Sequence, residues 1–120
     1  MKTENPILDK SFEFSISIIE LYKKLVACNE FVISKQILKS ATSIGANVRE
    51  ATAAQSKRDF ISKMSIASKE ARETEYWLLL LDRSKLVDLD YNELLFKSLE
   101  IIKILTSIVK SAQQSLEIKH

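Results

Sequence analysis

The sequence predicts an all-α protein, an antiparallel up-down-up-down four-helix bundle that forms one domain over residues 1–120. Glycine and proline, which interrupt helices and form tight turns, occur only once each in the chain. Apolar residues recur at spacings of three and four, the period of a helix face, in four separate stretches. Helices of about 25 residues joined by short links favour antiparallel neighbours, which leads to the bundle.

The first helix is expected over about residues 6–28, because Asn5 can cap it and Pro6 suits its first turn. Its apolar residues form two stripes, of which one can face the core and the other needs a further partner. One stripe consists of Phe12, Ile16, Ile19, Tyr22 and Val26. The other stripe consists of Phe14, Ile18, Leu21 and Leu25.

The second and third helices are expected over about residues 30–55 and 57–83, as a hairpin whose turn ends at the capping box of Ser56 and Asp59. Small residues in the core seam of the second helix allow close packing. That seam is Ile37, Ala41, Ile44, Val48 and Ala51. The seam of the third helix is Phe60, Met64, Ala67, Ala71, Thr74, Leu78 and Leu81.

The fourth helix is expected over about residues 91–116, with a capping box of Asp90 and Glu93 at its start. Its predicted core seam is Leu95, Leu99, Ile102, Leu105, Val109, Ala112 and Leu116. Apolar residues beyond one seam predict a closed homo-oligomer, because large exposed apolar patches usually mark interfaces. The surplus assigned to this interface is Phe14, Ile18, Leu21, Leu25, Leu94, Ile101, Ile104 and Ile108.

The composition argues against an enzyme, a cofactor, a metal or a small-molecule substrate. One glycine cannot form a glycine-rich phosphate loop, and His120, the sole histidine, is an unsuitable base for Cys28. Glu70 and Glu73 lie one turn apart as di-iron ligands do, but no Glu-x-x-His motif accompanies them. We expect a cytoplasmic location, since one cysteine allows no internal disulfide and no secretory leader is recognised. The apolar run Trp77–Leu81 is far below the about 20 residues of a membrane span.

The polar positions of the second and third helices follow a recognisable order. Residues 36–50 read QILKSATSIGANVRE, residues 56–60 read SKRDF, and residues 66–78 read IASKEARETEYWL. This pattern resembles the four-helix-bundle family named after the intervening sequences of 23S ribosomal RNA genes, also called S23 ribosomal proteins. The resemblance implies a bacterial homopentamer without catalytic residues. It also implies similarity to the accessory variability protein of diversity-generating retroelements, a basic pentamer that binds nucleic acid and a reverse transcriptase.

Charge is unevenly distributed along the chain, although the net charge is only +2. Residues 31–72 hold eight Lys or Arg against three acids, whereas residues 73–100 hold three against seven. The basic candidates for binding RNA or DNA phosphates are Lys35, Lys39, Arg49, Lys57, Arg58, Lys69 and Arg72. The alternative is a solvated face whose charges form surface pairs of the Asp59–Lys63 and Glu93–Lys97 type.

A polar stripe runs beside the apolar seam of the second helix. It consists of Gln36, Ser40, Ser43, Asn47 and Glu50. The stripe is either a recognition face or, more simply, a hydrogen-bond network with a neighbouring helix that includes Glu70 or Glu73. Tyr76 and Trp77 could stack on bases, but packing in the core or in a subunit interface is the simpler interpretation.

Two functions remain open at this point. The first is an oligomeric accessory protein that binds RNA or DNA, which the basic segment and the family resemblance favour. The second is a scaffold that holds a partner protein through its charged faces, which the nearly balanced total charge favours.

Overall fold

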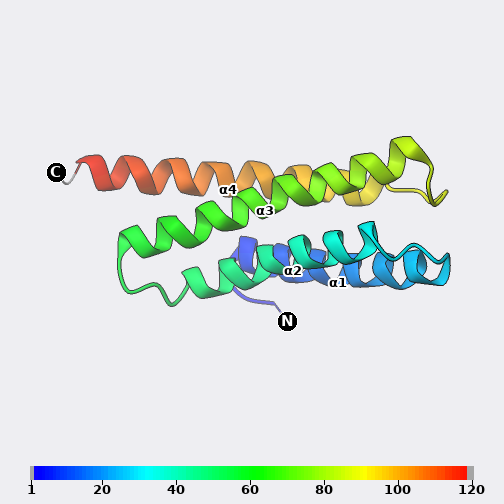
Figure 1. Cartoon of the computed structure of the whole chain (residues 1–120). Coiled ribbons are helices and arrows are strands. Elements are labelled where there is room, and N and C mark those ends of the chain that lie inside the picture. The colour runs from blue at the N-terminus through cyan, green and yellow to red at the C-terminus, as the bar shows by residue number, and fades with distance from the viewer. Residues whose placement is uncertain (1, 119–120) are drawn as a thin grey trace.

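The computed structural model describes residues 2–118, which form four helices joined by short loops (Figure 1). The helices are α1 (Pro6–Ala27), α2 (Ile33–Ala51), α3 (Lys57–Ser84) and α4 (Asn92–Ile118). Residues 2–118 contain no strand, so the all-α prediction with four helices is confirmed. Figure 1 shows each helix running back alongside the helix before it. Within the described chain, no helix is both long and apolar enough to cross a membrane.

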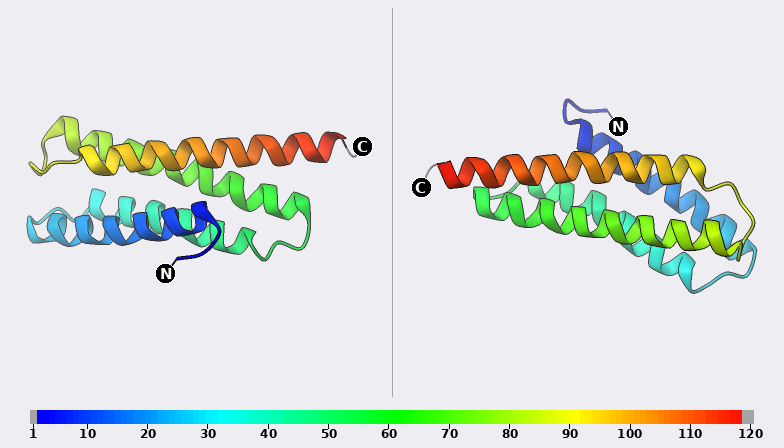
Figure 2. Two further views of the ribbon diagram at one scale, coloured as in Figure 1. Left: turned by 180° about the vertical axis from the view of Figure 1, so that it is seen from behind. Right: turned by 90° about the horizontal axis from the view of Figure 1, so that it is seen from above.

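Each helix packs against two others. α1 contacts α2 and α4, and α3 contacts the same two helices, while the described parts of α1 and α3, and of α2 and α4, lie diagonally opposite without contact. The molecule is elongated, with extents of 53 × 27 × 21 Å. α3 and α4, with 28 and 27 residues, are longer than α1 and α2, with 22 and 19. Their far ends therefore extend beyond the α1–α2 pair (Figure 2).

Two of the expected helix starts are confirmed. The side chain of Asn5 accepts a hydrogen bond from the Leu8 amide at 3.2 Å, with Pro6 in the first turn of α1. The Ser56 hydroxyl accepts from the Asp59 amide at 3.0 Å at the start of α3.

The capping box expected at the start of α4 is wrong. Asp90 accepts from the amide of Asn92, only two residues ahead, at 3.0 Å. The helix therefore begins at Asn92, and the Glu93 side chain pairs with Lys97 at 3.1 Å. Asp90 favours a local turn before the helix, because a short side chain can bond to the backbone two residues on.

The second helix is shorter than expected at both ends: it ends at Ala51 and not near residue 55, and it begins late because the chain turns between Cys28 and Val32. Asn29 has a φ of 63°, a left-handed conformation that asparagine tolerates, and it ends α1. The buried Glu30 carboxylate then accepts from the amides of residues 32, 33 and 34, which satisfies the first turn of α2. A glutamate that caps the following turn in this way has no simple sequence pattern, and the helix begins three positions after the expected residue 30.

The seams expected for α2 and α3 form the centre of the core. All five seam residues of α2 are at most 3% exposed. In α3, Phe60 is half-buried and the remaining seam residues are at most 2% exposed. Both predictions are confirmed, apart from the partial exposure of Phe60.

The assignment of the two α1 stripes to core and interface is wrong. The stripe given to the interface, Phe14, Ile18, Leu21 and Leu25, is 0–5% exposed and lies in the core. Phe12, Ile16 and Ile19 of the other stripe are 38–43% exposed. The rotation of α1 is set by its contact with α2, where Ser15 donates to the Ala41 carbonyl at 3.3 Å beside Gly45.

The apolar arc of α4 is also rotated from the expected position. Ile101, expected at the interface, is 1% exposed, whereas Leu99, expected in the core, is 44% exposed. Leu94, Ile104 and Ile108 are partly buried against the core. The core arc is centred between the two sets, because α4 packs against α1 on one side and α3 on the other.

Candidate nucleic-acid interface

Two polar stripes border the groove between α3 and α4. Arg58, Ser62, Ser65, Lys69 and Arg72 recur along α3 at spacings of four and three. Lys103, Thr106, Lys110 and Gln113 recur along α4 at spacings of three and four. These spacings keep each stripe on one face of its helix. The two stripes therefore run side by side along α3 and α4.

The groove contains two adjoining cavities that share Gln113. The first, of about 260 Å³, is lined by Ser65, Ser68, Arg72, Thr106, Val109, Lys110 and Gln113. The second, of about 310 Å³, is lined by Arg58, Ile61, Ser62, Gln113 and Leu116. No acidic residue lines either cavity. The groove therefore combines cations with hydroxyl and amide groups.

Hydrogen bonds across the groove position two of its cations. The Arg72 guanidinium donates to the Thr106 hydroxyl at 3.2 Å, and the Lys57 ammonium donates to the Ser115 hydroxyl at 3.0 Å. Both cations are exposed and form no ion pair with the described residues. Their remaining donors are free to bind an anion, and guanidinium, ammonium and hydroxyl groups are the usual donors to phosphate oxygens.

The structure separates the seven basic candidates into two groups. Lys57, Arg58 and Arg72 lie at the α3–α4 groove, and Lys69 is exposed on α3 nearby. The α2 cations lie elsewhere: Lys35 and Lys39 are exposed, and Arg49 lines a cavity between α1 and α2. Arg49 therefore lies on the α1 side of α2, away from the α3–α4 groove.

α4 supplies the other side of the groove, although the basic segment of the sequence, residues 31–72, does not include it. Thr106, Lys110 and Gln113 line the first cavity. Their spacing of four and three, which places them on one face of a helix, is the signal in the sequence that points to α4.

The two expected surface pairs had different outcomes. Glu93 and Lys97 pair at 3.1 Å, as expected. The Asp59–Lys63 pair is wrong, because Lys63 instead reaches Glu50 on α2 at 3.1 Å. The Asp59 carboxylate accepts from the Gln55 amide at 3.3 Å, where it caps the start of α3.

The polar stripe of α2 changes from buried to exposed along its length. Ser40 is fully buried, and its hydroxyl lies 2.8 Å from that of the equally buried Thr74 on α3. Asn47 is half-buried and bonds to Ser43 within α2. The expected bond to Glu70 or Glu73 is absent from the described residues, while Gln36 is exposed and Glu50 pairs with Lys63. Only part of the stripe is therefore an inter-helix network.

The aromatic pair lies at the surface of α3. Tyr76 is 54% exposed and packs edge-on against the half-buried Trp77, with ring centroids 5.2 Å apart. The Trp77 indole donates to Glu73 at 3.4 Å. Of the two alternatives, packing in the core is wrong for Tyr76, and packing in a subunit interface stays a prediction.

Cys28 and His120 are the residues that a Cys–His catalytic pair would need. Cys28 is exposed in the α1–α2 turn, and His120 lies outside the described residues. Within residues 2–118, no group of three or more His, Cys, Asp or Glu side chains could hold a metal ion.

Comparisons with known proteins support the family resemblance. The family model described as 23S rRNA-intervening sequence protein matches residues 3–107. A crystal structure of a protein of unknown function from the S23 ribosomal protein family of Bacteroides thetaiotaomicron is 56% identical, with a TM-score of 0.83. That similarity covers 87% of this chain and 98% of the other. No curated protein matches the chain.

Proposed function

Because the chain belongs to the family of 23S rRNA-intervening sequence proteins, we propose that it is a non-catalytic, oligomeric protein that binds RNA or DNA through the α3–α4 groove. The observation that carries this proposal is the acid-free lining of the two groove cavities, in which cations and hydroxyl groups from two helices converge.

The proposed contacts are to the phosphate backbone. Arg58, Arg72 and Lys110 supply positive charge from both sides of the groove, and the serine and threonine hydroxyls add neutral donors. Neutralising phosphates releases counterions, so binding is expected to weaken as salt rises. The exposed Lys69 and Lys103 extend the cationic surface along both helices.

The proposed assembly is a homopentamer of antiparallel bundles in the bacterial cytoplasm. The number five comes from the family resemblance. Support for an oligomer of some size comes from exposed large apolar side chains, which include Phe12, Ile16 and Ile19 on α1.

A pair of charge-matched variants tests the groove. Arg72→Gln/Lys110→Gln removes two cations from the groove, and Lys35→Gln/Lys39→Gln removes two exposed cations from α2. Both variants change the net charge equally. We expect the groove variant to lower the affinity for a structured RNA and to reduce the slope of log affinity against log salt by about 1–2. The α2 variant should keep the parent's slope.

The outcomes of filter binding at several salt concentrations are distinct. Equal losses in both variants would indicate a diffuse electrostatic attraction in place of a groove. A loss confined to the α2 variant would move the interface to Lys35 and Lys39. A parent protein that binds neither RNA nor duplex DNA would contradict nucleic-acid binding altogether.

A scaffold that binds a partner protein is the second candidate function. It is favoured by apolar side chains exposed on α3 and α4, with Tyr76 at 54%, Phe96 at 64% and Leu99 at 44%. Absence of nucleic-acid binding in the parent, together with loss of a partner protein on Phe96→Ser, would support this function.

A further inference from the structure

We propose that the apolar face between α1 and α2 of one copy docks into the acid-rimmed groove between α1 and α4 of a second copy. The inference rests on the oligomeric part of the proposed function and names the two surfaces that meet. It does not depend on nucleic-acid binding, because neither surface includes the α3–α4 groove.

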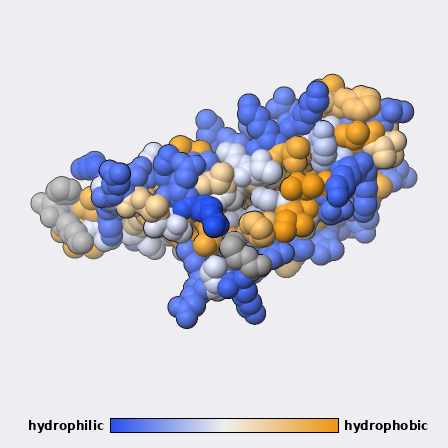
Figure 3. Space-filling view, turned by 90° about the horizontal axis from the view of Figure 1, so that it is seen from below, coloured by the Kyte–Doolittle hydropathy of each residue, from blue (hydrophilic) through white to orange (hydrophobic). Residues whose placement is uncertain are grey.

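The docking face presents an apolar ridge beside a cation. Phe12, Ile16 and Ile19 project from α1 with 38–43% of their surface exposed. A cavity of about 340 Å³ lies beside this ridge, and Arg49 is the one charged residue of its lining. Figure 3, which views the molecule from the side of α1 and α2, shows apolar side chains gathered among hydrophilic ones on this face. Such a face is expected to be covered by an apolar partner.

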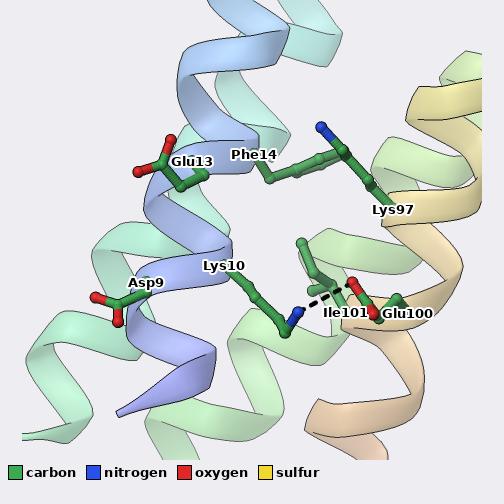
Figure 4. A pocket seen from close by; sticks show the side chains of 7 residues that line it. All are labelled: Asp9, Lys10, Glu13, Phe14, Lys97, Glu100 and Ile101. Atoms are coloured by element: carbon green, nitrogen blue, oxygen red, sulfur yellow. Dashed lines mark hydrogen bonds and ion pairs between the residues drawn. The ribbon is translucent and has the colours of Figure 1, made fainter. Parts of the chain in front are cut away.

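The receiving groove follows the seam between α1 and α4. Two cavities of about 270 and 340 Å³ lie along it and share Lys97. Phe14 and Ile101 line the first, and Leu21 and Leu94 line the second. Figure 4 shows the first cavity, where the Lys10–Glu100 ion pair, at 3.5 Å, bridges the two helices.

The charges of the two surfaces are complementary. Six carboxylates and three lysines border the groove, whereas the cavity of the docking face has Arg49 and no acid. Glu13 and Asp90 of the groove form no ion pair with the described residues. The exposed Lys35 on α2 adds a second cation beside the docking face. Opposite charges steer two copies together and fix their register.

The spacing of the apolar groups also matches. Phe12 and Ile19 of the docking ridge are seven residues apart, and so are Phe14 and Leu21, which line the two cavities of the groove. Seven residues correspond to about 10 Å along a helix. Two projecting side chains of one copy can therefore reach two successive hollows of the next, as knobs do in packed helices.

The position of the two surfaces favours a closed ring. They are adjacent sides of the bundle that share α1, so they face different directions. Because the surfaces differ, contacts run head to tail, and such contacts close when the rotation between copies permits. A right angle between the directions in which the two surfaces face suits a ring of four copies, and a slightly wider angle suits a ring of five. The shared helix α1 then lies toward the ring axis and the α3–α4 groove lies away from it.

Two variants, each of which lacks one of the two surfaces, test this arrangement by light scattering coupled to size exclusion. Ile16→Asp places a charge on the docking face, at a side chain 43% exposed and so tolerant of substitution. Glu13→Arg/Glu93→Arg reverses two charges of the groove. Each variant alone is expected near the 13.7 kDa mass of one chain. An equimolar mixture is expected at twice that mass and no higher, since each copy retains one complementary surface.

Leu86→Asp is the matched control, because it adds the same charge at an apolar residue that is 58% exposed and lies outside both surfaces. It should keep the parent's mass. Phe12→Asp serves as a second docking-face variant if Ile16→Asp does not fold. An oligomeric parent whose mass survives both docking-face changes, or a mixture that restores the full oligomer, overturns the assignment of surfaces. A monomeric parent overturns the assembly as well, while the salt-dependent binding assay still decides nucleic-acid binding independently.

Discussion

Tyr91 holds the loop between α3 and α4 against the core. Its side chain is 1% exposed, and its hydroxyl donates to the Val87 carbonyl at 2.7 Å. Burial, and after it the carboxylates of Asp82 and Asp88, raises the pKa of Tyr91 above its ordinary value of 10.0. The neutral phenol is thus part of the folded structure.

This raised pKa predicts a loss of stability at alkaline pH. Well below pH 10, the phenol is protonated in both the folded and the unfolded state. As pH rises above 10, the phenol loses its proton first in the unfolded chain. The free energy of unfolding should therefore fall as pH rises from about 10 toward the folded pKa. Tyr91→Phe should cost about 1 kcal/mol at neutral pH by removing one of the two hydrogen bonds to the Val87 carbonyl, which keeps its bond from the Leu89 amide at 3.0 Å, and should reduce the alkaline fall.

Urea denaturation at neutral and alkaline pH measures both effects. Tyr76→Phe is the control, since Tyr76 is 54% exposed, and it should follow the parent at every pH. Parallel curves for the parent and Tyr91→Phe would show that the phenol does not titrate differently in the folded state.

At the residue scale, the sequence predicted buried positions better than hydrogen-bond partners. The burial of Val48 followed from apolar spacing alone. The partner of Ser40 did not, because the spacing of Thr74 places it in the apolar seam of α3 and does not indicate a hydroxyl that bonds to α2. A side-chain hydrogen bond depends on the relative height of two helices, and one sequence does not contain that information.

At the scale of a helix, periodicity located the helices but left the rotation of α1 open. Both of its stripes recur at spacings of three and four and consist of large apolar residues, so either could face the core. The choice is made by small residues, because Ser11 and Ser15 allow α1 to approach α2 at Gly45. The lining of the candidate site depends in the same way on the rotations of α3 and α4. Only the packing of these two helices shows which of their polar stripes face the same groove.

The close approach at Gly45 can be tested directly. A Cβ atom added there would lie 3.3 Å from the Ser15 hydroxyl, which itself donates to the Ser11 and Ala41 carbonyls. Alanine is favoured over glycine within a helix by about 1 kcal/mol. We expect Gly45→Ala to lose most of this gain in the parent and to recover about 0.5–1 kcal/mol of it in a Ser15→Ala background.

A double-mutant cycle of thermal or urea unfolding supplies the measurement. The coupling between the two positions is the quantity of interest, because Ser15→Ala alone also removes a hydrogen bond between α1 and α2. An equal effect of Gly45→Ala in both backgrounds would mean that Ser15 does not limit the approach of the helices.

At the scale of the whole molecule, the surfaces proposed for binding and for assembly lie on different sides of the bundle. The basic groove lies between α3 and α4, whose far ends extend beyond the shorter pair (Figure 2). The surfaces proposed for assembly lie on α1 with α2 and on α1 with α4. Binding and assembly can therefore be altered separately.

This separation predicts that assembly changes the apparent affinity for long nucleic acids without changing the groove itself. In a ring with α1 toward the axis, the α3–α4 grooves face outward, and one long strand can occupy several of them. Linked sites raise the effective concentration, so avidity can exceed the affinity of one site by at least about 100-fold. The parent should therefore bind an RNA of about 60 nucleotides much more tightly than one of about 10.

Two variants test this prediction. Ile16→Asp, with an intact groove and no assembly, should show a much smaller difference between the two RNA lengths. Arg72→Gln/Lys110→Gln should weaken binding to both lengths while keeping the parent's mass. If Ile16→Asp is monomeric and still favours the long RNA as strongly as the parent does, the grooves of neighbouring copies do not act together.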